Sequence, residues 1–139
     1  MDDDFALLKV IASASRHRIL NLLAKGVDHP EDLAGRLGLR RQSVDKHLLE
    51  LYGWGFIDRS AIFPADGRPR IVYRLSDRGK EFVGQVDTLV QDYHQGVLAD
   101  YQQNLDFLEG KLASGEVDEG VYRKQRRSLE ARYRRFLEG

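Results

Sequence analysis

A run of polar and cationic side chains at positions 40–47 holds the residues of this chain that are best suited to binding chemistry. Guanidinium, ammonium, amide and hydroxyl groups form hydrogen bonds with phosphate oxygens and with the edges of nucleic-acid bases. The run comprises Arg40, Arg41, Gln42, Ser43, Asp45, Lys46 and His47. The carboxylate of Asp45 differs from the others, because it could accept a hydrogen bond from a cytosine amino group but would repel phosphate. We predict that these residues contact double-stranded DNA.

Two short amphipathic helices must position this run. The apolar positions at helical spacing are Leu33, Ala34 and Leu37 in the first helix and Val44, Leu48 and Leu51 in the second. Gly38 lies between them and permits a tight turn. Gln42 and Lys46 lie opposite the second apolar stripe, whereas His47 lies beside it and is expected at the boundary of the core. A helix pair of this kind also occurs in helical bundles that bind no nucleic acid, so the next segment decides the interpretation.

That next segment has the pattern of a β-hairpin. Residues 56–63 and 70–75 are rich in β-branched and aromatic side chains, and Ile71, Tyr73 and Leu75 alternate with other residues as in a half-buried strand. A polar turn with two prolines, residues 64–69, separates the two strands. It carries Arg68 at its tip and Arg70 at its exit, and we predict that both arginines reach the DNA minor groove.

In order and composition, residues 8–83 resemble the ArsR-like winged-helix regulators, with the MarR-like group as a looser relative. The resemblance rests on ASASRHRILNLLAKG at 12–26, DLAGRLGLRRQSVDKHLLEL at 32–51, GFIDR at 55–59 and YRLSDRGKEF at 73–82. It covers about half of the chain and implies a dimeric transcription regulator. Many such proteins sense metals through cysteine and histidine, but this chain has no cysteine and its four histidines are scattered. We therefore expect no metal site and no cofactor.

The charge distribution agrees with a DNA-binding face. Lys plus Arg and Asp plus Glu each number 22, so the formal net charge is zero. Residues 38–80 nevertheless carry nine basic and five acidic groups, a net of +4, whereas residues 81–120 carry one basic and nine acidic groups, a net of −8. The positive field is therefore expected over the helix pair and the hairpin.

The second half of the chain has the pattern of a helical hairpin. Apolar residues recur at intervals of three and four from Phe82 to Leu112, after Ser76 as the expected N-cap. Gly115 marks a turn into a shorter basic helix over residues 118–137. The expected fold is mostly α with a small β-hairpin wing: a winged helix-turn-helix domain over residues 1–78, then a long helix and a shorter antiparallel helix over residues 79–139. We expect these last helices to form a dimerisation hairpin, because a long apolar stripe needs a partner.

Together these features predict a sequence-specific transcriptional regulator that binds an inverted-repeat operator as a homodimer. The alternative from another class is a winged-helix module that binds a protein and no specific DNA. Two further uses stay open: the basic last helix as an extra phosphate-binding arm, and Tyr93, Tyr101 and Tyr133 as the lining of a small-molecule effector pocket. The chain shows no catalytic motif, no span apolar enough for a membrane and no secretory signal at its start. A non-enzymatic, cytoplasmic protein is therefore expected.

Overall fold

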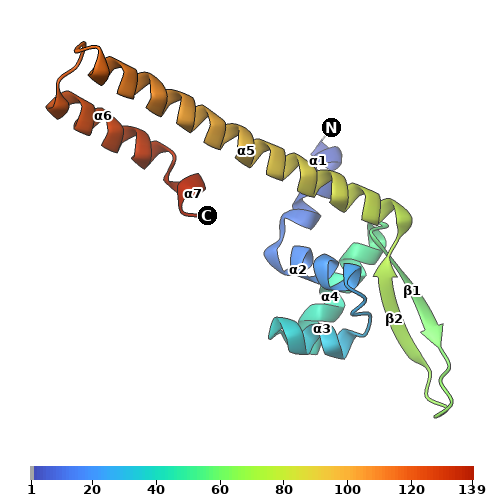
Figure 1. Cartoon of the computed structure of the whole chain (residues 1–139). Coiled ribbons are helices and arrows are strands. Elements are labelled where there is room, and N and C mark those ends of the chain that lie inside the picture. Colours follow the sequence, from blue (N-terminus) through green and yellow to red (C-terminus); the bar gives the residue numbers. More distant parts are fainter. Residues whose placement is uncertain (1) are drawn as a thin grey trace. The chain divides into compact units, whose positions relative to one another are not determined.

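The computed structural model describes the backbone of residues 2–139 and the side chains from Phe5 onward. The described chain is mostly helical, with one two-stranded antiparallel sheet, as the sequence predicts (Figure 1). It divides into two compact units, one ending at Gly84 and the other comprising Gln85–Gly139. The expected boundary between residues 78 and 79 falls in the first turn of a helix that enters both units. The assignment of DNA binding to the first half and of dimerisation to the second half stays a prediction.

The first two helices meet at a compact junction around Ser13. Helix α1 (Asp2–Ala12) ends there, and Ser13 is the N-cap of α2 (Ala14–Ala24), its hydroxyl accepting a hydrogen bond from the Arg16 backbone N–H at 3.4 Å. The Arg16 guanidinium turns back and donates to the carbonyls of Val10 and Lys9 at 2.5 and 3.3 Å. These carbonyls lie in the last turn of α1, where helical acceptors are otherwise unsatisfied. Arg16 therefore joins the two helices by capping one of them.

Helices α3 (Pro30–Leu37) and α4 (Arg41–Gly53) form the predicted helix-turn-helix. The ring of His29 accepts a hydrogen bond from the Glu31 N–H at 3.2 Å and caps the start of α3. Gly38 ends α3 with a φ of 66°, a left-handed conformation in which a side chain would be strained. The predicted apolar stripes form the core: Leu33, Ala34, Leu37, Val44, Leu48 and Leu51 are all buried, packed with Ile19 and Leu20 of α2 and with Phe56 and Ile57.

Strands β1 (Ile57–Ile62) and β2 (Arg70–Leu75) form the wing. They pair antiparallel from Ile57 opposite Leu75 to Ile62 opposite Arg70, so residues 63–69 extend beyond the ladder (Figure 1). Gly67 turns this tip with a φ of 79° and donates its N–H to the Pro64 carbonyl at 3.0 Å. At the base of the wing, the Tyr73 N–H donates to the carbonyl of Asp28 at 2.9 Å. The wing is therefore tied to the loop before α3 as well as to the end of α4.

A close backbone contact fixes the start of helix α5 (Asp77–Ala113) against the end of α4. The Ser76 hydroxyl donates to the Gly55 carbonyl at 2.6 Å and accepts from the Gly79 N–H at 2.9 Å, which confirms Ser76 as the N-cap. The Ser76 N–H also donates to the carbonyl of Phe56 at 3.0 Å. A Cβ atom at position 79 would lie 2.1 Å from that same carbonyl oxygen. Only glycine permits this approach, because real Cβ contacts are not shorter than 3.0 Å.

The second unit is a helical hairpin in which α6 (Glu119–Arg132) runs back beside α5 (Figure 1). Its core contains Leu105, Leu108 and Tyr133, and the ring of Tyr133 lies 5.5 Å from that of Tyr101. The single helix expected over residues 118–137 is wrong in one respect: it ends at Arg132 and restarts as the short α7 (Arg134–Leu137). The interruption lies at Tyr133, beyond which the Phe136 ring packs on α5. Aromatic packing on α5 thus coincides with the break.

Candidate nucleic-acid interface

Helix α4 has one fully buried face and one polar, exposed face. Val44, Leu48 and Leu51 have no accessible surface, whereas Gln42 and Lys46 on the opposite side are exposed. Ser43 and His47, one helical turn apart, are half-buried along one border of the buried face. The helix therefore presents an amide and an ammonium group to solvent while its other side anchors it in the unit.

Leu49 lies on the exposed face of α4 and is 65% accessible. An isolated exposed apolar side chain is common on protein surfaces. Leu49 nevertheless adds a methyl-bearing group next to the amide of Gln42 and the ammonium of Lys46.

The chain's one tryptophan, Trp54, lies at the end of α4 with 41% of its surface accessible. Its ring N–H donates a hydrogen bond to Glu50 at 3.0 Å.

The N-terminus of α4 remains open to an anion. In the described chain Arg40, the N-cap, makes no side-chain hydrogen bond that caps this helix, and its first turn holds no acidic residue. The first backbone bond across the turn runs from the Val44 N–H to the Arg40 carbonyl at 3.1 Å, which leaves the N–H groups of residues 41–43 ahead of the helical ladder. These groups and the positive end of the helix dipole favour a negatively charged partner, as a DNA phosphate would be.

Two carboxylates hold the guanidinium of Arg41 at this end of the helix. Its Nε lies 3.0 Å from Oδ1 of Asp45, one turn along α4, and one terminal nitrogen lies 3.5 Å from Oε1 of Glu31 on α3. The side chains of Arg41, Asp45 and Glu31 are 47%, 51% and 74% exposed. Exposed pairs of this kind contribute about 0–1 kcal/mol each, so Arg41 can exchange them for a DNA group.

His47 is placed to act as a neutral side chain. Burial, and secondarily the positive charge of Arg16, lowers the pKa of His47 from its usual 6.5. A lowered pKa keeps the imidazole uncharged at neutral pH, where it offers a hydrogen bond but no positive charge. Half-burial of His47 confirms its predicted position at the boundary of the core. Any contact of His47 with phosphate would be that of a neutral ring.

The two arginines of the wing differ in how their side chains are engaged by Asp66. Asp66 accepts a hydrogen bond from the Arg68 backbone N–H at 3.2 Å and forms an ion pair with the Arg70 guanidinium at 3.3 Å. One carboxylate thus orders the tip and engages Arg70, while the Arg68 guanidinium forms no hydrogen bond or ion pair with any of the described residues. Because both side chains are exposed, Arg68 is the freer cation of the wing.

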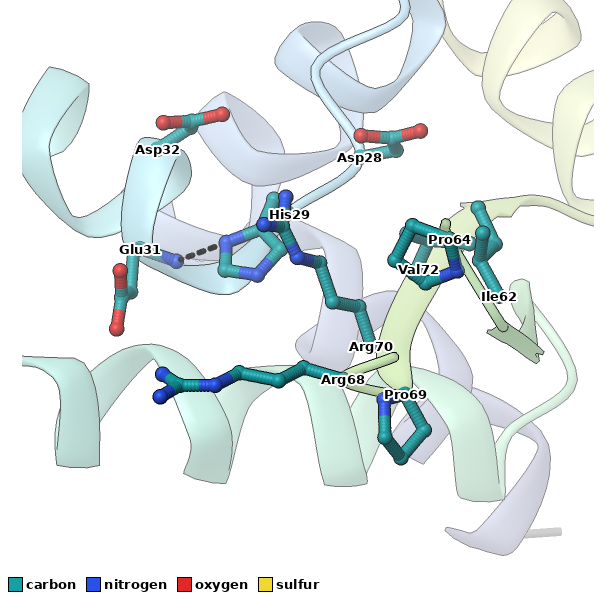
Figure 2. Close-up of a pocket in the computed structure, with 10 residues that line it drawn as sticks. All are labelled: Asp28, His29, Glu31, Asp32, Ile62, Pro64, Arg68, Pro69, Arg70 and Val72. Carbon is teal, nitrogen blue, oxygen red and sulfur yellow. Dashed lines mark hydrogen bonds between the residues drawn. The ribbon is translucent and has the colours of Figure 1, made fainter. Parts of the chain in front are cut away.

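An open hollow of about 610 Å³ lies between the wing and the start of α3. Figure 2 shows Arg70 extending from the wing towards His29. The lining on the α3 side is Asp28, His29, Glu31 and Asp32, and on the wing side Ile62, Pro64, Arg68, Pro69, Arg70 and Val72. Acidic groups thus face basic ones across the hollow, which favours a wing held near α3.

The described residues include no group of three or more His, Cys, Asp or Glu side chains that could hold a metal ion. No helix in the described part of the chain is long and apolar enough to cross a membrane.

Sequence reasoning missed two side chains of this region. Glu31 was overlooked because its ion pair with Arg41 depends on how α3 and α4 cross, although a carboxylate in the first turn of the preceding helix was visible as a signal. Arg16, which the sequence analysis does not single out, caps α1 and lies close enough to His47 for its positive charge to lower the pKa of that side chain. The structure brings positions 40–47 together on one helix end and places Arg68 and Arg70 on the separate wing.

Comparison with known proteins identifies the fold. No family model matches the chain, and no curated protein matches it in sequence. Among solved structures, a transcriptional regulator homologue from Pyrococcus horikoshii OT3 is similar with a TM-score of 0.58 and 19% identity, over 70% of this chain and 98% of that one. The reduced form of the transcriptional regulator YodB from B. subtilis gives 0.56 and 13%, over 63% and 84%.

A MarR family transcriptional regulator from Silicibacter pomeroyi DSS gives a TM-score of 0.53 at 21% identity, over 84% of this chain and 78% of that one. At such identities the likeness establishes the fold. The chain has the winged-helix fold of transcriptional regulators, with α4 in the place of the second helix of the helix-turn-helix and β1–β2 as the wing.

Proposed function

We propose that this chain is a sequence-specific, double-stranded DNA-binding transcriptional regulator that acts as a homodimer. The proposal is supported by the polar, exposed face of α4 within a winged-helix fold. The N-terminus of this helix lies beside that face and is not capped by the side chain of Arg40. A helix in this place enters the major groove in winged-helix and related folds. The four sequence motifs further support an ArsR-like regulator, with the MarR-like group as the looser relative.

In this proposal the two ends of the interface have different tasks. The exposed face and N-terminus of α4 enter the major groove and bind both base edges and the flanking phosphates. The contributing residues are Arg40, Arg41, Gln42, Ser43, Asp45, Lys46 and His47. Arg68 and Arg70 extend the contact into the adjacent minor groove, whose narrow A·T tracts attract arginine.

Exposed apolar side chains on α5 support the homodimer. Leu89 is 69% accessible, Tyr93 is 66% and Val90 is 49%. Exposed apolar side chains that lie close together on one helix form a candidate protein interface, and a second copy of the chain supplies an identical, self-complementary surface. Pairing two hairpins would build a four-helix assembly and place two α4 helices about one DNA turn, roughly 34 Å, or a multiple of it apart. The operator would then be an inverted repeat.

Binding to a duplex at several salt concentrations tests the proposal. Contacts to phosphate release counterions, so the affinity of the wild-type chain should fall steeply as salt rises. Lys46→Ala and Arg68→Ala should each weaken binding and reduce the salt slope by about 1. Lys111→Ala, which removes a lysine of the second unit that lies over the Phe107 ring, is the matched control. Binding that ignores salt, or no binding to any duplex, would favour the protein-interaction module instead.

The same purified chain and its variants test two further uses: phosphate binding by the basic α6 and effector binding by the tyrosines. A loss of affinity in Lys124→Ala equal to that in Lys46→Ala would assign the basic face of α6 to phosphate binding. Tyr101 and Tyr133 pack on each other, and Tyr133 is buried, which favours a core role over an effector pocket. A thermal shift with a metabolite panel tests the pocket directly.

A further inference from the structure

We propose that Asp45 is a positioning residue, which holds Arg41 so that the end of its guanidinium reads a guanine in the major groove, and that Glu31 competes for the same guanidinium until DNA displaces it. This inference rests on the proposed function and adds to it a division of roles within the contact set. It assigns Asp45 to the protein's own arginine instead of to a base or a phosphate.

The geometry of Arg41 decides which of its donors remain available. Asp45 engages Nε at 3.0 Å and thereby approaches the guanidinium from its side. Of the two terminal nitrogens, Glu31 engages one at 3.5 Å, and the other forms no hydrogen bond or ion pair with any of the described residues. Guanine presents two acceptors, O6 and N7, in the major groove, and arginine recognises them with a pair of N–H donors. With Nε occupied by Asp45, that pair is the two terminal nitrogens, directed away from Asp45.

The two carboxylates are not equivalent. Asp45 lies on the same helix as Arg41, four residues away, so the helix itself sets their separation. Glu31 belongs to another helix, is 74% exposed and makes the longer contact. A base that needs both terminal nitrogens must replace Glu31 but can leave Asp45 in place. Asp45 therefore fixes the direction of Arg41 in the complex, whereas Glu31 opposes the complex.

Removing the Asp45 charge has two effects of opposite sign, and these distinguish positioning from mere repulsion. Loss of one negative charge beside the groove raises affinity for every duplex, because phosphate repulsion falls. Loss of the side-on contact leaves the Arg41 guanidinium free to adopt other directions, which weakens discrimination between bases. A carboxylate that only repelled phosphate would produce the first effect without the second.

In the experiment, the full-length chain selects duplexes from a random-sequence library. The same selection is done with four variants: Asp45→Asn, Glu31→Gln, Arg41→Met and the double variant Arg41→Met/Asp45→Asn. The base preferences of the selected duplexes are then compared with those of the wild type. The winning wild-type duplex and a scrambled duplex are then titrated at one salt concentration. Glu50→Gln is the matched control, since it removes a carboxylate from α4 that contacts Trp54 and not Arg41. Circular dichroism verifies that each variant folds.

We expect the wild-type selection to enrich a guanine that Arg41→Met no longer requires. Asp45→Asn should bind the scrambled duplex as well as or better than the wild type but reduce the ratio of selected to scrambled affinity about fivefold or more, within the discrimination available to a bidentate arginine contact. In the Arg41→Met background, Asp45→Asn should not change that ratio. Glu31→Gln should tighten binding to the selected duplex, and Glu50→Gln should leave the ratio as it is.

An Asp45→Asn variant that keeps the wild-type ratio and the guanine preference would overturn the assignment while leaving the proposed function intact. So would an unchanged guanine preference in Arg41→Met. A wild-type chain that binds no duplex at all would refute the proposed function, and the positioning role with it.

Discussion

Gly79 should be the least replaceable glycine of helix α5, and Gly79→Ala should destabilise the first unit by about 1–3 kcal/mol. The added Cβ would lie 2.1 Å from the carbonyl oxygen of Phe56, which is backbone and cannot rotate away as a side chain would. Relief requires the start of α5 to move from Phe56, a residue only 3% exposed that also accepts the Ser76 N–H.

Three contributions give the magnitude. Overpacking of a well-packed site typically destabilises by about 1–3 kcal/mol. Losing the hydrogen bond from the Ser76 N–H adds about 1 kcal/mol, and alanine in a helix returns about 1 kcal/mol relative to glycine. Gly84→Ala is the matched control, because a Cβ there meets nothing within 4 Å and the helix preference should dominate. That variant should be unchanged or more stable by up to about 1 kcal/mol.

The assay is urea unfolding followed by the fluorescence of Trp54, which lies in the first unit and therefore reports on that unit. Gly79→Ala should lower the unfolding midpoint with little change in the denaturant slope, and Gly84→Ala should not lower it. A Gly79→Ala chain that unfolds at or above the wild-type midpoint would refute the close approach of α5 to Phe56.

Three other perturbations follow from the same structure. Because the pKa of His47 is lowered in the folded chain, the unfolded chain takes up the proton more readily, so the free energy of unfolding should decrease as pH falls through about 6.5; His47→Gln should flatten this dependence in urea titrations at several pH values. Tyr133→Ala removes a side chain that is 7% exposed, and should destabilise the second unit by about 3–5 kcal/mol in thermal unfolding followed by circular dichroism; a loss below 1 kcal/mol would contradict the packing on Tyr101. Leu89→Lys and Tyr93→Lys should reduce the solution mass to that of one chain if α5 pairs with a second copy; light scattering measures this, and an unchanged oligomer would place the interface elsewhere.

The elements of the fold could be predicted because their signals are local. Helical spacing marked both apolar stripes of the helix-turn-helix, Ser76 marked a helix start, and Gly38 marked the turn. The strand ends were also visible, since β-branched residues stop at the proline-containing tip. Each of these patterns involves residues within a few positions of one another, which is why the sequence reveals them.

What could not be predicted depends on residues that are distant in sequence. The closeness of Gly79 to Phe56, and the second partner of Arg41 on α3, both require the crossing of elements to be known. The interruption at Tyr133 was invisible because residues 118–137 keep a helical period on both sides of it. In the candidate site, the spacing of four residues between Arg41 and Asp45 was available in the sequence, but the hydrogen bond between their side chains became visible only in the three-dimensional structure.

The pairing of Ile62 with Arg70 is the last of the wing's ladder, and the bond from the Tyr73 N–H to the Asp28 carbonyl anchors β2 two pairs from the other end. Residues 63–69 therefore lie outside every strand pair. Insertions or deletions in this tip would change how far Arg68 extends without altering the spacing between the strands and the helix pair. The length of the tip can therefore differ between related chains while helix α4 keeps the same support from α2, α3 and β1.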